Sequence, residues 1–246
     1  MALKDYVPVK LRRLRGQWLH ALRQDAAHFE RVERKTFFRR ACRALVFNGI
    51  RGDYAEFGCC GAETFALAFH AFRHAGSPRP MWAFDSFRGL PAQAGPADRH
   101  PVWVEGDMSM TLTDFKRVCL SHGITPSDYR AVEGFYEDSL RDAGLERSDR
   151  PREIALAYID CDLYSSTIEV LRFLEARLRH GMILVFDDYY CWSETAVSGE
   201  RNACNEFFAE HPKYRLLPFQ SIGWGGMSFV VEDKSLLHRG DIGVHF

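Results

Sequence analysis

The sequence has no long apolar run and no large charge of either sign. Its 246 residues carry a formal net charge of −1, and no stretch approaches the roughly 18 uninterrupted apolar residues of a membrane span. The first residues, MALKDYVPVKLRRLRGQ, lack the apolar core and cleavage site of a secretory signal. A near-neutral chain gives no reason to expect nucleic acid or an anionic membrane as its main partner. We therefore expect a cytoplasmic protein that neither spans a membrane nor binds nucleic acid.

Cysteine and histidine motifs are also missing. The seven cysteines are an odd number and include no CxxC pair, so reduced thiols in the cytoplasm are the simplest interpretation. The ten histidines show no HExxH or comparable zinc spacing. No internal repeat or low-complexity segment is present.

The N-terminal segment, residues 1–48, differs from the rest of the chain. Its arginines alternate with leucine, phenylalanine and tryptophan at spacings of three and four, which predicts an amphipathic helix over residues 4–47. The helix would pack its apolar face on the main domain, act as a lid, or make a homo-oligomer contact. Residues 49–246 are expected to form the main domain.

From Gly52 onward, short apolar runs alternate with helical stretches, a pattern that predicts a parallel sheet with helical crossovers. The last two runs have no helix between them and should pair antiparallel. Residues 88–106 are expected to form a loop, and a helix over 166–179 is predicted to begin with Ser166 and Glu169 in capping-box spacing. The expected strands are Tyr54–Phe57, Met81–Phe84, Tyr129–Val132, Ile154–Ile159, Met182–Phe186, Tyr214–Phe219 and Met227–Val231.

The first strand runs into a turn that is typical of cofactor binding. The run Glu56–Gly61 reads E-x-G-x-x-G, which lacks the first glycine of a dinucleotide fingerprint and is closer to the D/E-x-G loop of S-adenosylmethionine (SAM) enzymes. Glycines here let the backbone approach a ligand, and an acidic residue near the turn can attract the sulfonium. Asp85 ends the second strand, where a carboxylate can bind the two ribose hydroxyls. A purely structural turn and a local cap remain the alternatives.

Four aspartates follow two strands that should be neighbours in the sheet. Asp160 and Asp162 follow one strand, and Asp187 and Asp188 follow the next. Four anions at one sheet edge repel each other unless something offsets them. Oxygen-only ligation suits Mg²⁺, with Mn²⁺ as a substitute. Helix capping by these residues is the alternative.

Several motifs in this order resemble a known family. The most specific is FDSFRGLP at residues 84–91; EFG at 56–58, EGFYEDSL at 133–140, the D-x-D-x-Y-x-S run from Asp160 and the pair Asp187-Asp188 support it. Over roughly residues 50–232 the chain resembles the macrocin O-methyltransferase type, which includes SAM- and Mg²⁺-dependent enzymes that methylate sugar hydroxyls on antibiotics.

This resemblance implies a Rossmann-like class I methyltransferase fold, α/β, with a seven-stranded, mostly parallel sheet whose last strand is antiparallel. It also implies roles for individual residues. The metal ligands would be Asp160, Asp187 and Asp188, with Asp162 as general base. The cofactor site would comprise Glu56, Gly58, Gly61, Asp85, Ser86, Asp138, Ser139 and Asp160. The loop around Gly61, CCGAE at 59–63, departs from the bulkier residue and glycine pair of relatives.

We therefore predict a SAM-dependent O-methyltransferase of natural-product or glycan biosynthesis. Its acceptor would be a glycoside, a sugar or another vicinal diol, whose hydroxyl is held by the metal and deprotonated by Asp162. Alternatives are a metal-independent SAM methyltransferase, an NAD(P)-dependent oxidoreductase and a non-catalytic SAM-binding protein. The four-aspartate group and the missing first glycine argue against the oxidoreductase.

Overall fold

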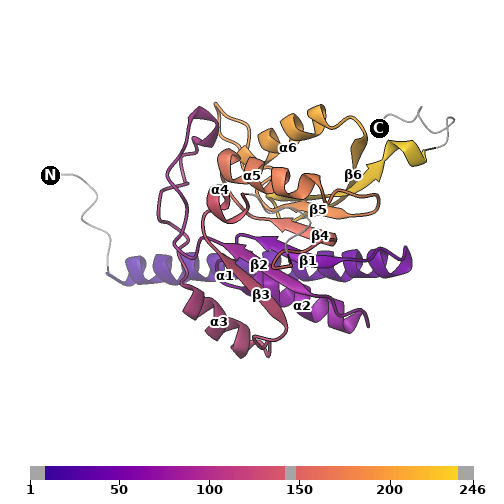
Figure 1. Cartoon of the computed structure of the whole chain (residues 1–246). Helices are drawn as coiled ribbons and strands as arrows, with labels where there is room; N and C mark the ends of the chain where they lie inside the picture. Colours follow the sequence, from indigo (N-terminus) through magenta and orange to yellow (C-terminus); the bar gives the residue numbers. More distant parts are fainter. Residues whose placement is uncertain (1–8, 142–147, 238–246) are drawn as a thin grey trace.

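The computed structural model describes the backbone of residues 9–141 and 148–237, and the side chains of this part from Asp25 onward. A seven-stranded sheet lies at the centre with helices on both faces (Figure 1). The strands are β1 (Asp53–Phe57), β2 (Met81–Asp85), β3 (Tyr129–Glu133), β4 (Ile154–Ile159), β5 (Ile183–Phe186), β6 (Tyr214–Ile222) and β7 (Gly226–Asp233). The helices are α1 (Val9–Phe47), α2 (Glu63–His74), α3 (Leu112–Ser121), α4 (Tyr136–Ser139), α5 (Tyr164–Glu175) and α6 (Gly199–Glu210), with short 3-10 turns η2 (Pro96–Asp98) and η3 (Lys234–Leu236).

The sheet has the order β3-β2-β1-β4-β5-β7-β6. The pairs from β3 to β5 are parallel, whereas β7 runs antiparallel to both β5 and β6. This confirms the predicted mostly parallel sheet with a reversed last strand. Since parallel strands point the same way, the residues that follow β1, β2, β4 and β5 meet at one edge of the sheet.

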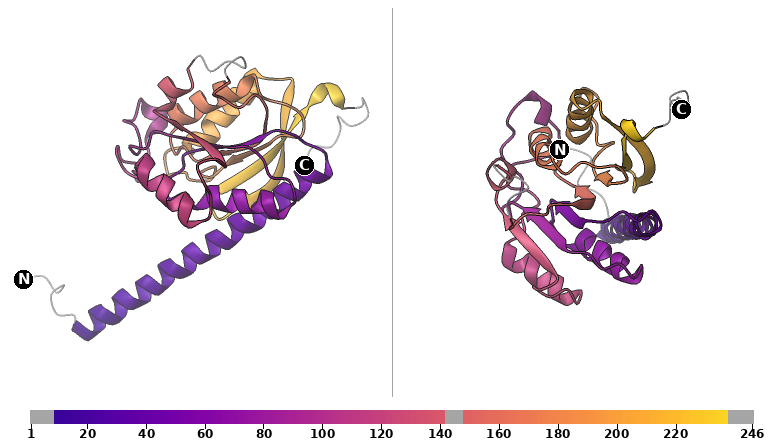
Figure 2. Two further views of the ribbon diagram at one scale, coloured as in Figure 1. Left: turned by 60° about the horizontal axis from the view of Figure 1, so that its bottom comes forward. Right: turned by 45° about the vertical axis from the view of Figure 1, so that its right-hand side comes forward.

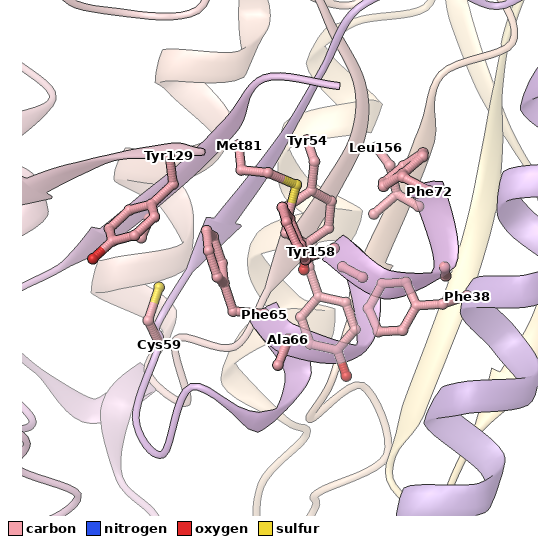
Figure 3. Packing of buried hydrophobic residues seen from close by; sticks show 14 of the residues in the cluster. Phe38, Tyr54, Cys59, Phe65, Ala66, Phe72, Met81, Tyr129, Leu156 and Tyr158 are labelled. Carbon is pink, nitrogen blue, oxygen red and sulfur yellow. The ribbon is translucent and has the colours of Figure 1, made fainter. Parts of the chain in front are cut away.

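Two buried clusters lie on opposite faces of the sheet because successive side chains of a strand alternate. On one face Tyr54 and Tyr158 pack with Phe38 of α1 and Phe65 of α2 (Figure 3). On the other face Phe57 and its neighbours pack beneath α5 and α6. All six residues of β4 are buried, as expected for a central parallel strand covered by helices on both sides.

Helix α1 is 39 residues long, and its N-terminal part extends away from the rest of the molecule (Figure 2). Its last turns belong to the core: Phe37, Phe38, Ala41, Cys42 and Leu45 are buried. The predicted helix over 4–47 is thus present from Val9, and residues 4–8 lie outside the described part. No helix of the described residues is both long and apolar enough for a membrane span.

The predicted start of α5 is wrong. The helix begins at Tyr164 and ends at Glu175, and its N-cap residue Leu163 makes no side-chain cap. The carboxylate of Asp98 instead accepts a hydrogen bond from the Ser165 amide, at 2.8 Å, so a distant residue satisfies a free N–H of the first turn. Ser166 therefore lies inside the helix and does not cap it.

Candidate functional site

The turn after β1 brings two strand ends together. Gly58 has a φ of +90°, and a Cβ added there would lie 1.8 Å from the carbonyl oxygen of Asp160. Only glycine allows this approach, and the Asp160 amide donates to the Phe57 carbonyl at 2.8 Å beside it. Gly61 also has a positive φ, but a Cβ there would meet nothing within 4 Å. Close packing thus explains the glycine at 58 and not the one at 61.

Asp85, at the end of β2, organises the same edge. One carboxylate oxygen accepts from the Cys59 amide and the other from the Phe87 amide, each at 2.6 Å. Burial raises the pKa of Asp85, and the two amide hydrogen bonds oppose that rise. The Ser86 hydroxyl donates to the Gly89 carbonyl at 2.8 Å. Each Asp85 oxygen keeps a second lone pair, so the carboxylate can still accept from a ligand hydroxyl.

Glu56 lies beneath this edge and not on its surface. Its side chain is 1% exposed and accepts a hydrogen bond from the Tyr54 hydroxyl. Burial raises the pKa of Glu56 to about 8, while the Tyr54 hydrogen bond lowers it. Its electrostatic effect on a ligand must therefore act through the wall of the site.

A cavity of about 690 Å³ opens where these segments meet. Four predicted cofactor residues line it: Gly58, Asp85, Ser86 and Asp160. The volume falls within the roughly 300–1,000 Å³ typical of small-molecule sites. The remaining wall comes from loop residues 88–92 and 94, from 105, 106 and 108, from Cys60, Cys161, Asp162 and Phe135–Glu137, and from residues 164–166, 168 and 169 of α5.

The segment around α4 contributes to the cavity wall. Phe135, Tyr136 and Glu137 line the wall, whereas Asp138 and Ser139 are not among the described lining residues. The Ser139 hydroxyl donates to the Gly134 carbonyl at 3.1 Å. Ser139 therefore serves the turn between β3 and α4, which carries the lining residues.

Three carboxylates gather beside the cavity. Asp160, Asp162 and Asp188 each place one oxygen so that the three atoms lie within 4.8 Å of one another. Asp162 has a φ of 60°, a left-handed conformation that costs a non-glycine residue energy and concentrates at functional sites. Burial, followed by the charge of Asp188, raises the pKa of Asp162 to about 9. Burial and the three other aspartates raise the pKa of Asp160 well above its usual range.

Such a carboxylate set is suited to a hard divalent cation. Three carboxylate oxygens that lie close together in a partly buried position repel each other. A cation that prefers oxygen ligands, such as Mg²⁺, offsets that repulsion. The set is open on the cavity side, because Asp160 and Asp162 also line the cavity. Donor type and position therefore both fit the predicted metal.

Asp187 is not a member of this close set. Its carboxylate accepts from the Arg34 guanidinium of α1, with Nη2 at 2.7 Å from Oδ2, and from the Tyr158 hydroxyl. The family resemblance implies Asp160, Asp187 and Asp188 as metal ligands and Asp162 as the general base. In the structure Asp162 is the third member of the close group, and Asp187 pairs with a cationic side chain.

Sequence reasoning missed one acidic residue at the site. Glu200, in the first turn of α6, is fully buried, and its two oxygens accept from the amides of Cys161 and Asp188, each at 2.9 Å. One side chain thus ties together the loops after β4 and β5. The available signal was position: Glu200 shares a helix face with Ala203, Cys204 and Phe207, all buried.

The segment after the aspartate pair carries exposed aromatic rings. Trp192 is 60% exposed and Trp224 is 69% exposed. The Tyr190 amide donates to the Gly225 carbonyl at 2.7 Å, so the turn between β6 and β7 lies beside this segment. Trp192 and Trp224 are therefore exposed on two segments that lie side by side.

A second cavity, of about 660 Å³, lies at the opposite edge of the sheet. It is lined by residues at the starts of β1, β2 and β4, including Asp53, Pro80 and Glu153. None of the predicted site residues reaches it, so the candidate site is the cavity beside the three aspartates.

Comparison with known proteins gives consistent matches. A family model described as macrocin O-methyltransferase matches residues 27–226. The 8-demethyl-8-(2,3-dimethoxy-alpha-L-rhamnosyl)-tetracenomycin-C 4'-O-methyltransferase of Streptomyces olivaceus is 28% identical over 66% of this chain and 60% of its own length. The mycinamicin III 3''-O-methyltransferase of Micromonospora griseorubida is 26% identical over 73% of this chain and 69% of its own length. The matched part thus spans about 60% of the first of these relatives.

Solved structures have the same fold. The O-methyltransferase NovP superposes with a TM-score of 0.64 at 21% identity, over 81% of this chain and 79% of NovP. The calicheamicin methyltransferase CalS11 gives 0.60 at 22% identity, over 80% and 77% of the two chains. At these identities the likeness establishes the fold, that of Rossmann-like class I methyltransferases.

Proposed function

Because the chain belongs to the macrocin O-methyltransferase family, we propose that it transfers the methyl group of SAM to a hydroxyl of a sugar or glycoside acceptor. One observation carries this proposal: the cavity that begins at Gly58 and Asp85 ends at the aspartates after β4. The cavity would therefore hold the cofactor next to carboxylates that could hold a hydroxyl. The named relatives support a sugar acceptor, since one is named for a rhamnosyl tetracenomycin.

The cofactor would occupy the 690 Å³ cavity. Asp85 would accept from the ribose hydroxyls, and Gly58 leaves the backbone open for close approach. Phe135 and Tyr136 line the wall, and an adenine would pack against this part of it. Glu56, buried below and with its pKa raised to about 8, would attract the positively charged sulfonium in its ionised form, so we expect it to affect SAM binding more than turnover and more strongly at higher pH.

A divalent cation, Mg²⁺ or Mn²⁺, would be held by Asp160 and Asp188, whose oxygens lie close to each other and to Asp162. With two carboxylate ligands from the protein, such a cation would still be able to take up water and acceptor hydroxyls, as Mg²⁺ commonly does. When bound, SAM supplies an electrophilic methyl group and the cation makes a nearby hydroxyl more acidic.

Asp162 is the proposed general base, and a cation held beside it would lower its pKa and leave it ionised. It lines the cavity and belongs to the close group of carboxylates, so its oxygen can reach the proton of a hydroxyl placed there. The turn that holds it in a left-handed conformation is fixed through the Cys161 amide by Glu200. The fixed geometry contributes by aligning the hydroxyl with the methyl group and excluding water.

Methyl transfer from isotopically labelled SAM to vicinal-diol glycosides tests this function. We expect transfer that is lost in Asp162→Asn, while SAM binding measured by calorimetry is unchanged. Full activity in Asp162→Asn would remove the base assignment. Full activity after removal of divalent cations by EDTA would instead favour a metal-independent methyltransferase. Tight NADH binding without SAM binding would favour the oxidoreductase.

The role of the N-terminal segment 1–48 and the location of the protein are also parts of this proposal. The projecting part of α1 (Figure 2) is suited to a lid or to a contact with another copy of the chain. A cytoplasmic location agrees with the seven free cysteines.

A further inference from the structure

The turn between β6 and β7 packs against the loop that carries the aspartate pair. A Cβ added at Gly225 would lie 3.2 Å from the carbonyl oxygen of Asp187, and one added at Gly226 would lie 3.1 Å from the same oxygen. The Tyr190 amide donates to the Gly225 carbonyl at 2.7 Å. Two backbone segments therefore approach closely here, and they place the turn at the edge of the sheet where β5 ends.

Trp224 lies in this turn, directly before Gly225. It is largely exposed, and its indole has no hydrogen bond or ring contact with another of the described residues. Its other neighbour, Gly223, faces α1, because a Cβ added at Gly223 would lie 3.8 Å from Cγ of Glu30. The turn that carries the Trp224 ring thus lies between α1 and the loop after β5.

The segment after Asp188 carries further exposed apolar side chains. The Asp188 carbonyl accepts from the Cys191 amide at 3.0 Å and from the Ser198 hydroxyl, so both ends of the segment are held to this backbone. Between them, Trp192 and Val197 are each more than half exposed and line a small cavity of about 350 Å³. Exposed apolar groups therefore lie on two neighbouring segments, each fixed to the backbone of the aspartate pair.

Such a surface is suited to one part of a sugar. Single exposed apolar side chains are common, but a group of them at the edge of a candidate site indicates a binding surface. One face of a pyranose ring presents mainly C–H groups, while its hydroxyls point outward from the rim. An indole offers a large, flat apolar surface, so it can cover the C–H face and leave the hydroxyls free to reach the carboxylates.

We propose that Trp224 is a specificity-determining residue that packs on the C–H face of the acceptor's sugar ring. This inference rests on the proposed function, because a sugar hydroxyl held at Asp188 brings its ring beside the two segments that flank the aspartate pair. Trp192 and Val197 bound the same surface on its other side. Packing on the sugar face is the same before and during methyl transfer, so Trp224 acts on KM and not on kcat.

Initial rates of methyl transfer to methyl α-L-rhamnopyranoside test the inference, since one relative is named for a rhamnosyl acceptor. In Trp224→Ala the KM for this probe should rise by roughly tenfold, and kcat should stay within about threefold of wild type. Trp224→Phe keeps a flat ring and should recover most of the affinity. Phe47→Ala is the matched control: this aromatic side chain is 90% exposed and follows Val46, which lines the second cavity at the opposite edge. It should leave KM unchanged.

Saturation-transfer NMR of the same rhamnoside, with MgCl2 and S-adenosylhomocysteine present, measures the contact without turnover. The C–H signals of the sugar ring should appear with wild type and fall several-fold with Trp224→Ala. A wild type that binds the rhamnoside but transfers no methyl group would reject the proposed function and leave this inference standing. Unchanged KM and unchanged saturation transfer in Trp224→Ala would overturn the inference, as would a wild type that does not bind the rhamnoside. A smaller assembly of Trp224→Ala in analytical ultracentrifugation would also overturn it, because the ring would then be covered by a second copy of the chain.

Discussion

The substitution Glu200→Gln tests whether Glu200 positions the loops of the site or only packs its helix. Glu200 is fully buried and accepts two backbone hydrogen bonds, each of 2.9 Å, from the loops after β4 and β5. Glutamine has a single acceptor oxygen, so one of the two amides would face an NH2 group. An unsatisfied buried donor costs about 1–3 kcal/mol. We expect a loss of about 2 kcal/mol, which lowers the Tm of a domain of this size by about 4–8 °C.

The assay is thermal unfolding of the protein without ligands, followed by titration with MgCl2. Glu210→Gln is the matched control, because the same change is made at an exposed position of the same helix and should alter stability by less than about 0.5 kcal/mol. Cation affinity should also fall in Glu200→Gln, since the backbone that carries Asp188 loses its anchor. Equal melting temperatures for the two variants would refute the argument. A lower Tm with unchanged cation affinity would reduce Glu200 to a structural role.

Three further predictions concern the cavity and its wall. Asp98→Ala removes the cap of α5 and should lower the free energy of unfolding by about 0.5–2 kcal/mol. It should also weaken SAM binding measured by calorimetry. Asp107→Ala, an exposed change in the same loop, should have neither effect. Cys60 is the exposed cysteine of the described residues and lines the cavity, so saturating SAM should slow its alkylation, as measured by mass spectrometry; an unchanged rate would place SAM elsewhere. Burial raises the pKa of Glu56 from 4.5 to about 8, so the stability it contributes is lost as pH rises through that range. Glu56→Gln should therefore gain stability relative to wild type between about pH 5 and about pH 8.5 in urea unfolding, and a constant difference would contradict the shift.

The fold could be predicted from sequence because its signals are local. The apolar run Ile154–Ile159 is a buried central strand, and the absence of a helix between the last two strands correctly indicated that they pair antiparallel. The start of α5 could not be predicted, since the capping group is Asp98, 67 positions from the Ser165 amide. A nearby serine in capping-box spacing is a weaker determinant than a buried carboxylate supplied from another loop.

The site was predictable to the level of the sheet edge and no further. Strand ends placed Gly58, Asp85, Ser86 and Asp160 around one cavity, as topology requires. Which aspartates come together in the close group depends on the turns that follow the strands, and sequence spacing does not specify those turns. Contacts across 153 positions, such as that of Arg34 with Asp187, likewise leave no local pattern.

The N-terminal helix cannot be treated as a detachable extension over its whole length. Phe38 stacks on Tyr158, the Tyr158 hydroxyl donates to Asp187, and Arg34, one turn before Phe38, pairs with the same carboxylate. The apolar packing and the polar contact therefore share one tyrosine, and a shift of α1 along the sheet would disturb both together. Because a packed core resists small displacements, the last turns of α1 fix the charge opposite Asp187. Any lid or oligomer role must accordingly belong to the N-terminal part of the helix, which projects from the rest of the molecule (Figure 2).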